Sequence, residues 1–273
     1  MTTATAGPAR VHRPDDRAYG DHVGDAARRW AELQGGRGIP PAILTAARVD
    51  PWTHEPRDFT APDVAVATPS RHAATVLLGE GGTVLDVGCG GGGAAFALDR
   101  ITAVTGVDRQ RDMLELFAAA ATARGVPHRI VAGTWPDIAE VAGAADVVLC
   151  HHVLHNVVDL PPFLRALTAA ARRGVVVEML AEHPLAWLDP LWLRFHGLRR
   201  PPPATADDAV AVLGELGIRP EVARWDRATV PRGDAAWVAR RLCLPPERTE
   251  DVAAALAELP ARPRQVATLT WRP

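Results

Sequence analysis

Short apolar runs alternate with alanine-rich helical runs along residues 83–180, and this rhythm restricts the possible folds more than any other feature. The apolar runs read VLDVG, AVTGVD, RIVAG, DVVLC and VVVEML. Because they lack the polar–apolar alternation of a half-exposed strand, we expect strands that are buried on both faces. Helices are expected between them, over 93–100, 110–124 and 161–172. Such strand–helix–strand units predict right-handed crossovers and an open, doubly wound α/β sheet that is mostly parallel.

The rest of the chain divides around this rhythm. Residues 1–15 have no apolar pattern and predict a disordered tail. Residues 16–68 predict a helical N-terminal cap, because they contain helical patterns that end at glycines and prolines but no convincing strand. We assign residues 69–273 to the main domain. Near its end, the runs PEVARWD and QVATLTWR alternate like half-buried strands.

Composition and charge argue against several classes of function. The formal net charge of −2 provides no general attraction for nucleic acid or for an anionic membrane. No apolar run approaches the roughly 18 residues of a membrane span, and the first residues lack the apolar core of a signal peptide, so we expect a cytoplasmic protein. Cys89, Cys150 and Cys243 have no repeated spacing, which argues against a disulfide framework or a zinc site. We therefore expect no bound metal.

A glycine-rich turn follows the first predicted strand. Gly88, Gly90 and Gly93 satisfy the pattern G-x-G-x-x-G where that strand passes into a helix. Glycines let the backbone turn tightly and approach a ligand, and a helix N-terminus presents free N–H groups. Asp108 ends the second strand, where its carboxylate can accept hydrogen bonds from ribose hydroxyls. Together these features predict a nucleotide-type ligand.

The same turn resembles the first motif of the class I S-adenosylmethionine-dependent methyltransferases. That motif reads D/E-x-G-x-G-x-G and is matched by Asp86, Gly88, Gly90 and Gly92. The resemblance continues through Asp108, RDMLELFAAAA, GTWPD and DVVLCHHVLHNVVDLPPFL, and spans roughly residues 78–180. It implies a seven-stranded Rossmann-like sheet and S-adenosylmethionine as the cofactor.

The resemblance also implies contacts for individual residues. The backbone of the turn should contact the methionine portion of the cofactor. The two carboxylates should contact its ammonium and its ribose. The residues after the second and third strands should contact its adenine. For Met113 and Trp135, core packing is the alternative. The expected cofactor-binding residues are Asp86 near the ammonium, Gly88, Cys89 and Gly90 along the methionine portion, Asp108 at the ribose, Arg109 and Met113 beside the adenine, Thr134 and Trp135 at the adenine edge, and His151.

Three histidines lie in the stretch LCHHVLHNVVD. His151 and His155 have the spacing of a zinc-binding pair, but the chain offers no pattern that completes such a site. His151 and His152 follow the fourth strand, where open α/β sheets bind ligands. If the strand continues through them, their side chains point in opposite directions. We expect His151 to contact the cofactor and His152 to act as a general base near the acceptor, whereas His155 is expected to pack or cap.

A Trp-rich helical insert, residues 181–204, interrupts the domain after the fifth strand. Because it begins at the ligand edge of the sheet, it is expected to form a lid over an organic acceptor; core packing and a homodimer contact are the alternatives. Thr205 and Asp208 then form a capping box that begins a helix. The arginine pairs 28–29 and 199–200 are expected on solvated faces, with recognition of an acidic substrate as the alternative.

These features favour a methyltransferase that acts on a small organic acceptor at oxygen or nitrogen. The reaction would be an in-line displacement that depends on alignment and on exclusion of water. Two alternatives remain, a protein that binds S-adenosylmethionine without methyl transfer and an NAD(P)-dependent oxidoreductase. The acceptor's identity is not encoded in these motifs.

Overall fold

The computed structural model describes residues 24–52, 66–227, 234–260 and 264–273. The disordered tail that we expect over residues 1–15 lies outside the described residues, as does the beginning of the predicted cap. None of the described helices has the length and apolar character needed to cross a membrane.

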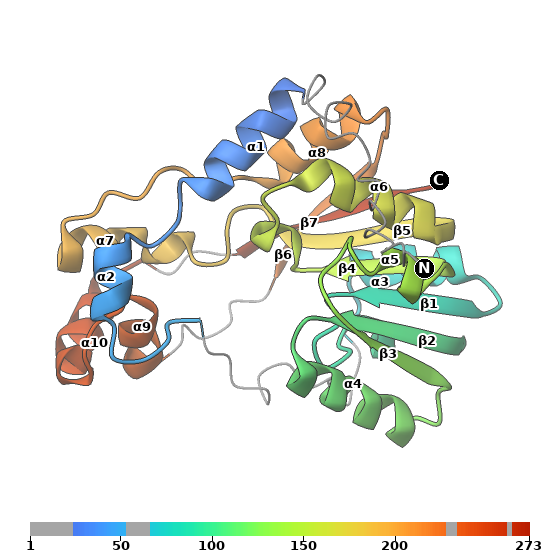
Figure 1. Ribbon diagram of the computed structural model, residues 1–273, viewed down its shortest axis with the longest axis horizontal. Helices are drawn as coiled ribbons and strands as arrows, with labels where there is room; N and C mark the ends of the chain where they lie inside the picture. The colour runs from blue at the N-terminus through green and yellow to red at the C-terminus, as the bar shows by residue number, and fades with distance from the viewer. Residues whose placement is uncertain (1–23, 53–65, 228–233, 261–263) are drawn as a thin grey trace, which may run out of the picture.

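A seven-stranded sheet in the order β3-β2-β1-β4-β5-β7-β6 forms the centre of the molecule (Figure 1). Strands β1 to β5 are parallel, and β7 lies antiparallel between β5 and β6. This arrangement confirms the predicted doubly wound, mostly parallel sheet. The strands are β1 (Gly82–Val87), β2 (Ile101–Asp108), β3 (His128–Ala132), β4 (Ala145–His151), β5 (Ala171–Leu180), β6 (Glu221–Arg227) and β7 (Arg264–Trp271).

Helices cover both faces of the sheet, so its central strands are apolar on both sides. Along β4, Val147 and Leu149 belong to one apolar cluster, whereas Val148 and Cys150 belong to the other. One face is covered by α1, α5, α6 and α8, and the other by α3 and α4 (Figure 1). These helices are α1 (Asp25–Gly35), α3 (Pro69–Leu78), α4 (Arg111–Ala123), α5 (Ala139–Ala142), α6 (Leu160–Ala170) and α8 (Ala206–Glu215).

Two of the predicted helices need correction. The helix expected over 93–100 is a single 3₁₀ turn, Ala95–Ala97, because Gly92 has a φ of 87° before it and Leu98 is extended after it. The helix expected over 161–172 ends at Ala170, because Ala171 already pairs with Ala145 in the sheet. The remaining predicted helices and strands agree with the structure in their bounds to within a few residues. The expected burial is wrong for β3 and β6, which are mostly exposed because they form the two edges of the sheet.

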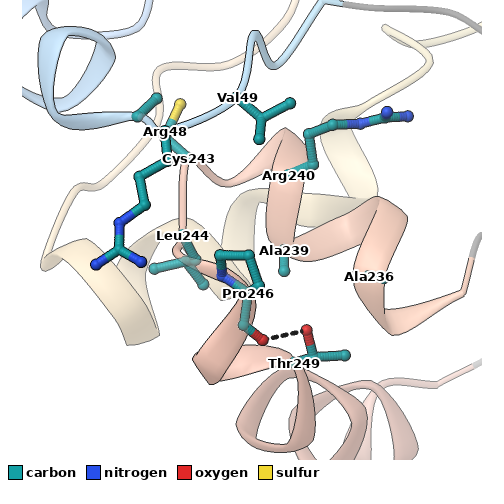
Figure 2. Close-up of a pocket in the computed structure, with 10 residues that line it drawn as sticks. Arg48, Val49, Ala236, Ala239, Arg240, Cys243, Leu244, Pro246 and Thr249 are labelled. Atoms are coloured by element: carbon teal, nitrogen blue, oxygen red, sulfur yellow. Dashed lines mark hydrogen bonds between the residues drawn. The ribbon is translucent and has the colours of Figure 1, made fainter.

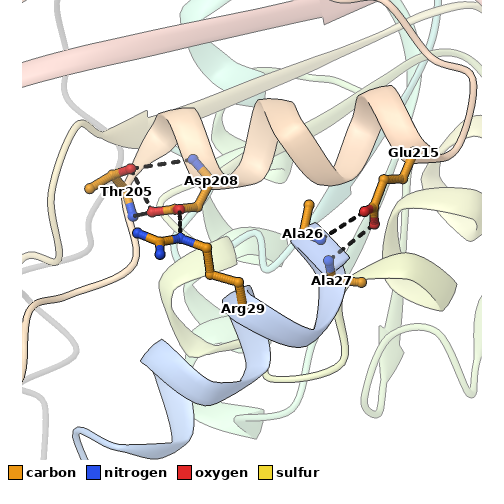
Figure 3. Close-up of polar contacts among 6 residues, drawn as sticks. All are labelled: Ala26, Ala27, Arg29, Thr205, Asp208 and Glu215. Carbon is orange, nitrogen blue, oxygen red and sulfur yellow. Dashed lines mark hydrogen bonds and ion pairs between the residues drawn. The ribbon is translucent and has the colours of Figure 1, made fainter. Parts of the chain in front are cut away.

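Carboxylates of α8 hold the N-terminal half of α1 (Figure 3). Glu215 accepts hydrogen bonds from the backbone N–H groups of Ala26, at 2.7 Å, and Ala27, at 3.1 Å. These are free N–H groups of the first helical turn, which α1 does not cap with a side chain of its own. Asp208 completes the predicted capping box with Thr205 and accepts from the Arg29 Nε at 2.9 Å. The N-terminal helix α1 is thereby held by contacts with α8, a helix that is far away in the sequence.

A helical lobe stands beside the sheet and combines three distant segments (Figure 1). Its core contains the Trp-rich insert, with Leu188 and Leu191 almost fully buried and Trp192 only 5% exposed. The partners of the insert were not foreseen, because they come from the connection between β6 and β7. The lobe helices are α2 (Pro41–Ala46), α7 (Asp189–His196), α9 (Ala235–Arg241) and α10 (Thr249–Glu258).

The lobe contains a cation–π contact and a cavity. Arg200, expected in solvent, instead stacks on Trp192 at 5.1 Å from the ring centroid, whereas Arg199 is exposed as expected. A cavity of about 230 Å³ lies between residues 47–49 and α9 (Figure 2). Its walls are mainly apolar, and Arg48 at its edge forms an ion pair with Glu247 at 2.8 Å.

Trp30 joins α1 to the sheet layer, and its removal tests this packing. Its side chain is fully buried, and its indole N–H donates to the Val157 carbonyl at 2.8 Å. We expect Trp30→Ala to lower the free energy of unfolding by about 3–5 kcal/mol. The matched change Trp30→Phe, which keeps most of the packing, should cost about 1–2 kcal/mol. Urea denaturation measures both; a loss below about 1 kcal/mol in Trp30→Ala would contradict the packing described here.

Candidate active site

The carboxyl ends of β1, β2 and β4 lie side by side, and the glycine turn joins β1 to the 3₁₀ turn at this edge. Gly88, Gly90 and Gly92 have φ angles of 71°, 50° and 87°, a region that favours glycine. A Cβ at Gly88 would lie 2.3 Å from the Val153 Cγ2, so the segment after β4 packs directly on the turn. The turn therefore requires glycines, both for its backbone conformation and for its packing against the segment after β4.

Asp108 connects this turn to the end of β2. Its carboxylate accepts hydrogen bonds from the Gly90 N–H at 3.1 Å and from the Gln110 N–H at 2.9 Å. A carboxylate has about four lone-pair sites, so each oxygen can accept a further hydrogen bond. The half-buried Asp108 can thus hold a ligand that offers two hydroxyl groups.

Asp86 lies at the end of β1 and is almost fully buried, with 1% of its surface exposed. Burial raises the pKa of Asp86 to about 7, and the negative charge of Asp108 contributes to the rise, whereas a hydrogen bond from the Ala95 N–H lowers it. The ionised form of this carboxyl group is destabilised in the free protein. A cationic group bound nearby would stabilise it.

His151 is the last residue of β4. Burial lowers its pKa to about 4, so the ring is neutral near pH 7. Its Nε2 is buried and has no hydrogen-bond partner among the described residues. An unpartnered buried nitrogen at the ligand edge fits contact with a polar ligand atom.

His152 lies beyond the end of β4 in the left-handed region, with a φ of 59°. The alternation of side chains expected for a continuing strand therefore does not apply to it. Its backbone N–H donates to the Glu178 carbonyl at 2.6 Å, and its Nε2 lies 3.0 Å from the Glu178 Oε1. Both the backbone and the ring of His152 are thus held by β5.

Glu178 was missed by the sequence reasoning. Burial alone would raise its pKa, but a hydrogen bond from His152, the charges of the two neighbouring histidines and a hydrogen bond from Ser70 lower it to about 2. Glu178 pairs with His151 across the parallel strands and is 7% exposed. The signal that could have revealed it is a single acid inside the apolar strand VVVEML.

The other expected site residues differ in accessibility. Arg109 and Thr134 are exposed, whereas Cys89 and Met113 are buried. Trp135 is 6% exposed and donates its indole N–H to the Phe163 carbonyl at 3.3 Å, so most of its ring packs in the core.

His155 and Asp159 lie just beyond these residues. His155 is buried and its Nε2 lies 3.0 Å from the Leu180 carbonyl oxygen, in keeping with a packing role. Asp159 occupies the N-cap position of α6 but makes no capping hydrogen bond through its side chain. Within the described part of the chain, no three metal-ligating side chains group together as a metal site would require.

The raised pKa of Asp86 predicts a specific dependence of stability on pH. Because the folded-state pKa lies above the unfolded value of 3.8, the contribution of Asp86 is largest in acid and is lost as the pH rises toward 7. Between pH 5 and pH 8 the wild-type protein should lose about 2.5 kcal/mol from this group. Asp86→Asn removes the titration, so the stability of the variant relative to wild type should increase by that amount over the same range. Urea denaturation at the two pH values tests this, and parallel pH profiles would refute it.

Comparisons with known proteins identify methyltransferases as similar to this chain. Residues 84–174 match a family described as a methyltransferase domain. The chain is 29% identical over 187 residues to a ubiquinone biosynthesis O-methyltransferase of Caulobacter vibrioides, covering 60% of this chain and 74% of that protein. It is 37% identical over 93 residues to the protein of the same description from Methylobacterium nodulans, covering 34% of this chain and only 37% of that protein.

A solved structure shows the same fold. The protein, a methyltransferase candidate from Bacillus halodurans, aligns with a TM-score of 0.54 and 16% identity over 76% of this chain and 99% of its own. The family match runs from within β1 to the first residues of β5 and includes the glycine turn, Asp108 and the two adjacent histidines. Residues 84–174 therefore match a methyltransferase domain, and the sheet that contains them has the fold of a solved structure described in those terms.

Proposed function

We propose that this protein transfers a methyl group from S-adenosylmethionine to a small organic acceptor. The observation that carries the proposal is the pair His152–Glu178, which lies at the same sheet edge as the glycine turn and Asp108. The names of the relatives favour oxygen over nitrogen as the atom that is methylated.

The cofactor would lie across the ends of β1, β2 and β4. Asp108 would accept hydrogen bonds from the ribose hydroxyls with its remaining lone pairs, and Asp86 would stabilise the ammonium by its charge. Gly88, Cys89 and Gly90 would line the methionine portion by backbone contact, and the unpartnered Nε2 of His151 would face a polar atom of the cofactor. Arg109 and Thr134, both exposed, would lie at the adenine with the accessible edges of Met113 and Trp135.

S-adenosylmethionine supplies an electrophilic methyl group on its sulfonium. A hydroxyl acceptor must lose a proton as its oxygen attacks in line, which requires a base at the acceptor side. The Glu178 Oε1, 3.0 Å from the His152 Nε2, can only accept, whereas the Arg227 Nη1, 3.4 Å from the same atom, can only donate. We assign the proton to Nε2 because the contact with Glu178 is shorter, which leaves the Nδ1 as the proton acceptor. In this proposal His152 removes the proton, and Glu178 fixes the tautomer and the orientation of the ring.

Loss of the Asp108 carboxylate tests cofactor binding. Asp108→Ala should weaken binding of both S-adenosylmethionine and S-adenosylhomocysteine by about ten- to a hundred-fold, because charge-assisted hydrogen bonds to the ribose are lost. The exposed residue Asp112, in the first turn of α4, offers the matched control Asp112→Ala. Titration calorimetry measures all three proteins. Unchanged affinity in a folded Asp108→Ala variant would remove this residue from the site, and binding of NAD instead would overturn the proposal.

The base and its positioning residue are tested by turnover, with release of S-adenosylhomocysteine measured across a panel of phenols and catechols. His152→Ala should lower kcat by about a hundred-fold. Glu178→Gln should lower kcat by a smaller factor, because the ring remains but its tautomer is no longer fixed. Neither change should alter the affinity for S-adenosylmethionine by much.

The control for these variants is His128→Ala, on an exposed residue at the start of β3. It should leave turnover unchanged. Near-normal turnover by His152→Ala would show that the acceptor needs no base at this position. If the wild-type protein binds the cofactor but releases no product with any acceptor, methyl transfer itself is wrong.

A further inference from the structure

A second cavity, of about 60 Å³, lies where the N-terminal segment meets the lobe. Three of its lining residues are arginines, Arg37, Arg200 and Arg241, and a fourth is His183. Apolar and aromatic side chains, including Trp52, Leu188 and Trp192, form the remaining wall. We propose that this cavity binds the carboxylate of a small apolar or aromatic acid, as the acidic end of the methyl acceptor. The link to the acceptor rests on the function proposed above.

Arg37 and Arg200 share one nearby carboxylate, that of Asp189, at this cavity. Arg37 forms a two-point ion pair with Asp189, with Nη2–Oδ1 and Nη1–Oδ2 distances of 2.7 and 3.1 Å. Arg200 forms no salt bridge with a carboxylate of the described residues; it donates instead to the backbone carbonyls of Arg37 and Gly38. Burial lowers the pKa of Arg200, and the charge of Arg37 lowers it further, more than Asp189 raises it. A bound anion would relieve this repulsion.

The lining residues Arg37 and Arg200 also carry buried donors for which the described residues offer no partner. Arg37 is 8% exposed, and its buried Nε has no hydrogen-bond partner among the described residues; the same holds for the buried Nε of Arg200. His183 accepts a hydrogen bond from the Leu185 N–H at its Nδ1, at 3.1 Å. A neutral ring in that arrangement carries its proton on Nε2, and burial keeps His183 neutral by lowering its pKa to about 3. Buried donors without partners favour an acceptor-rich ligand.

The size and walls of the cavity favour a carboxylate rather than a larger anion. About 60 Å³ accommodates a small planar group, and guanidinium groups recognise carboxylates through paired hydrogen bonds. Trp192 lies under the Arg200 guanidinium, so an aromatic ring or short apolar chain attached to the carboxylate would find apolar contacts beside it.

The cavity also lies close to the candidate active site. The ring of His183 packs edge-on against His155, with the centroids 5.6 Å apart. His155 in turn follows His152 by one short turn, and the charge of His152 affects its pKa. An acceptor anchored by its carboxylate would therefore be held on the acceptor side of the sheet edge.

Binding of two probes of equal shape tests the site in the full-length protein. Benzoate should bind at least about ten-fold more tightly than benzamide, because only benzoate carries the charge that the guanidinium groups recognise. Arg200→Gln should remove most of this preference, and Arg199→Gln, which alters the exposed neighbouring arginine, should leave it intact. Titration calorimetry measures binding, and thermal melts check that the variants fold.

The outcomes separate this proposal from the function. Equal affinity of the wild-type protein for the two probes would overturn the carboxylate site, whether or not the variants fold. Equal loss in Arg199→Gln and Arg200→Gln would also overturn it, because the effect would then reflect net charge alone. Titration with S-adenosylmethionine is independent of this cavity. If the protein prefers benzoate but does not bind S-adenosylmethionine, the carboxylate site is supported and the proposed methyl transfer is wrong.

Discussion

The central strands of this mostly parallel sheet are buried on both faces and leave polar groups few places to lie, and the rest of the structure depends on that constraint. Along β4 and β5 the side chains enter apolar clusters on either side, so the ligand edge is where charged and polar groups collect. Parallel order brings the carboxyl ends of β1, β2, β4 and β5 to that one edge. Asp86, Asp108 and Glu178 come from three different strands, yet they share it. Asp86 shows that this arrangement is unfavourable for a charged group, because burial and the charge of Asp108 disfavour its ionised form.

The regular strand conformation of β4 ends between His151 and His152. His151 is still part of β4, whereas His152 adopts a left-handed backbone conformation just after it. The backbone N–H and the ring of His152 both contact Glu178, so β5 stabilises this unfavourable conformation with two hydrogen bonds. The backbone carbonyl of Glu178 therefore fixes the direction of the chain, and its carboxylate fixes the orientation of the ring. Glu178 in turn remains ionised because its histidine and serine neighbours outweigh the effect of its burial.

The helical lobe depends on contacts between segments that are far apart in the sequence. α2, α7 and the pair α9–α10 belong to three different connections, and they share one apolar core. Arg37 joins the N-terminal segment to α7 through Asp189, and Arg200 joins the end of the insert to the backbone of the same segment. These arginines bring positive charge into a largely apolar region. The proposed carboxylate site is a consequence of this assembly rather than of any one segment.

The sequence by itself determined the sheet, its mostly parallel order, the glycine turn and the position of Asp108, because local periodicity and glycine spacing encode them directly. The capping box at Thr205 was also evident, since its hydrogen bonds span three residues. Only the tertiary structure decided that β5 supplies Glu178 to His152, that the insert packs against α9 and α10, and that Arg200 is drawn onto Trp192. Each of these contacts joins residues whose separation along the chain carries no periodic signal. They arise only when the sheet order and the packing of the lobe bring the segments together.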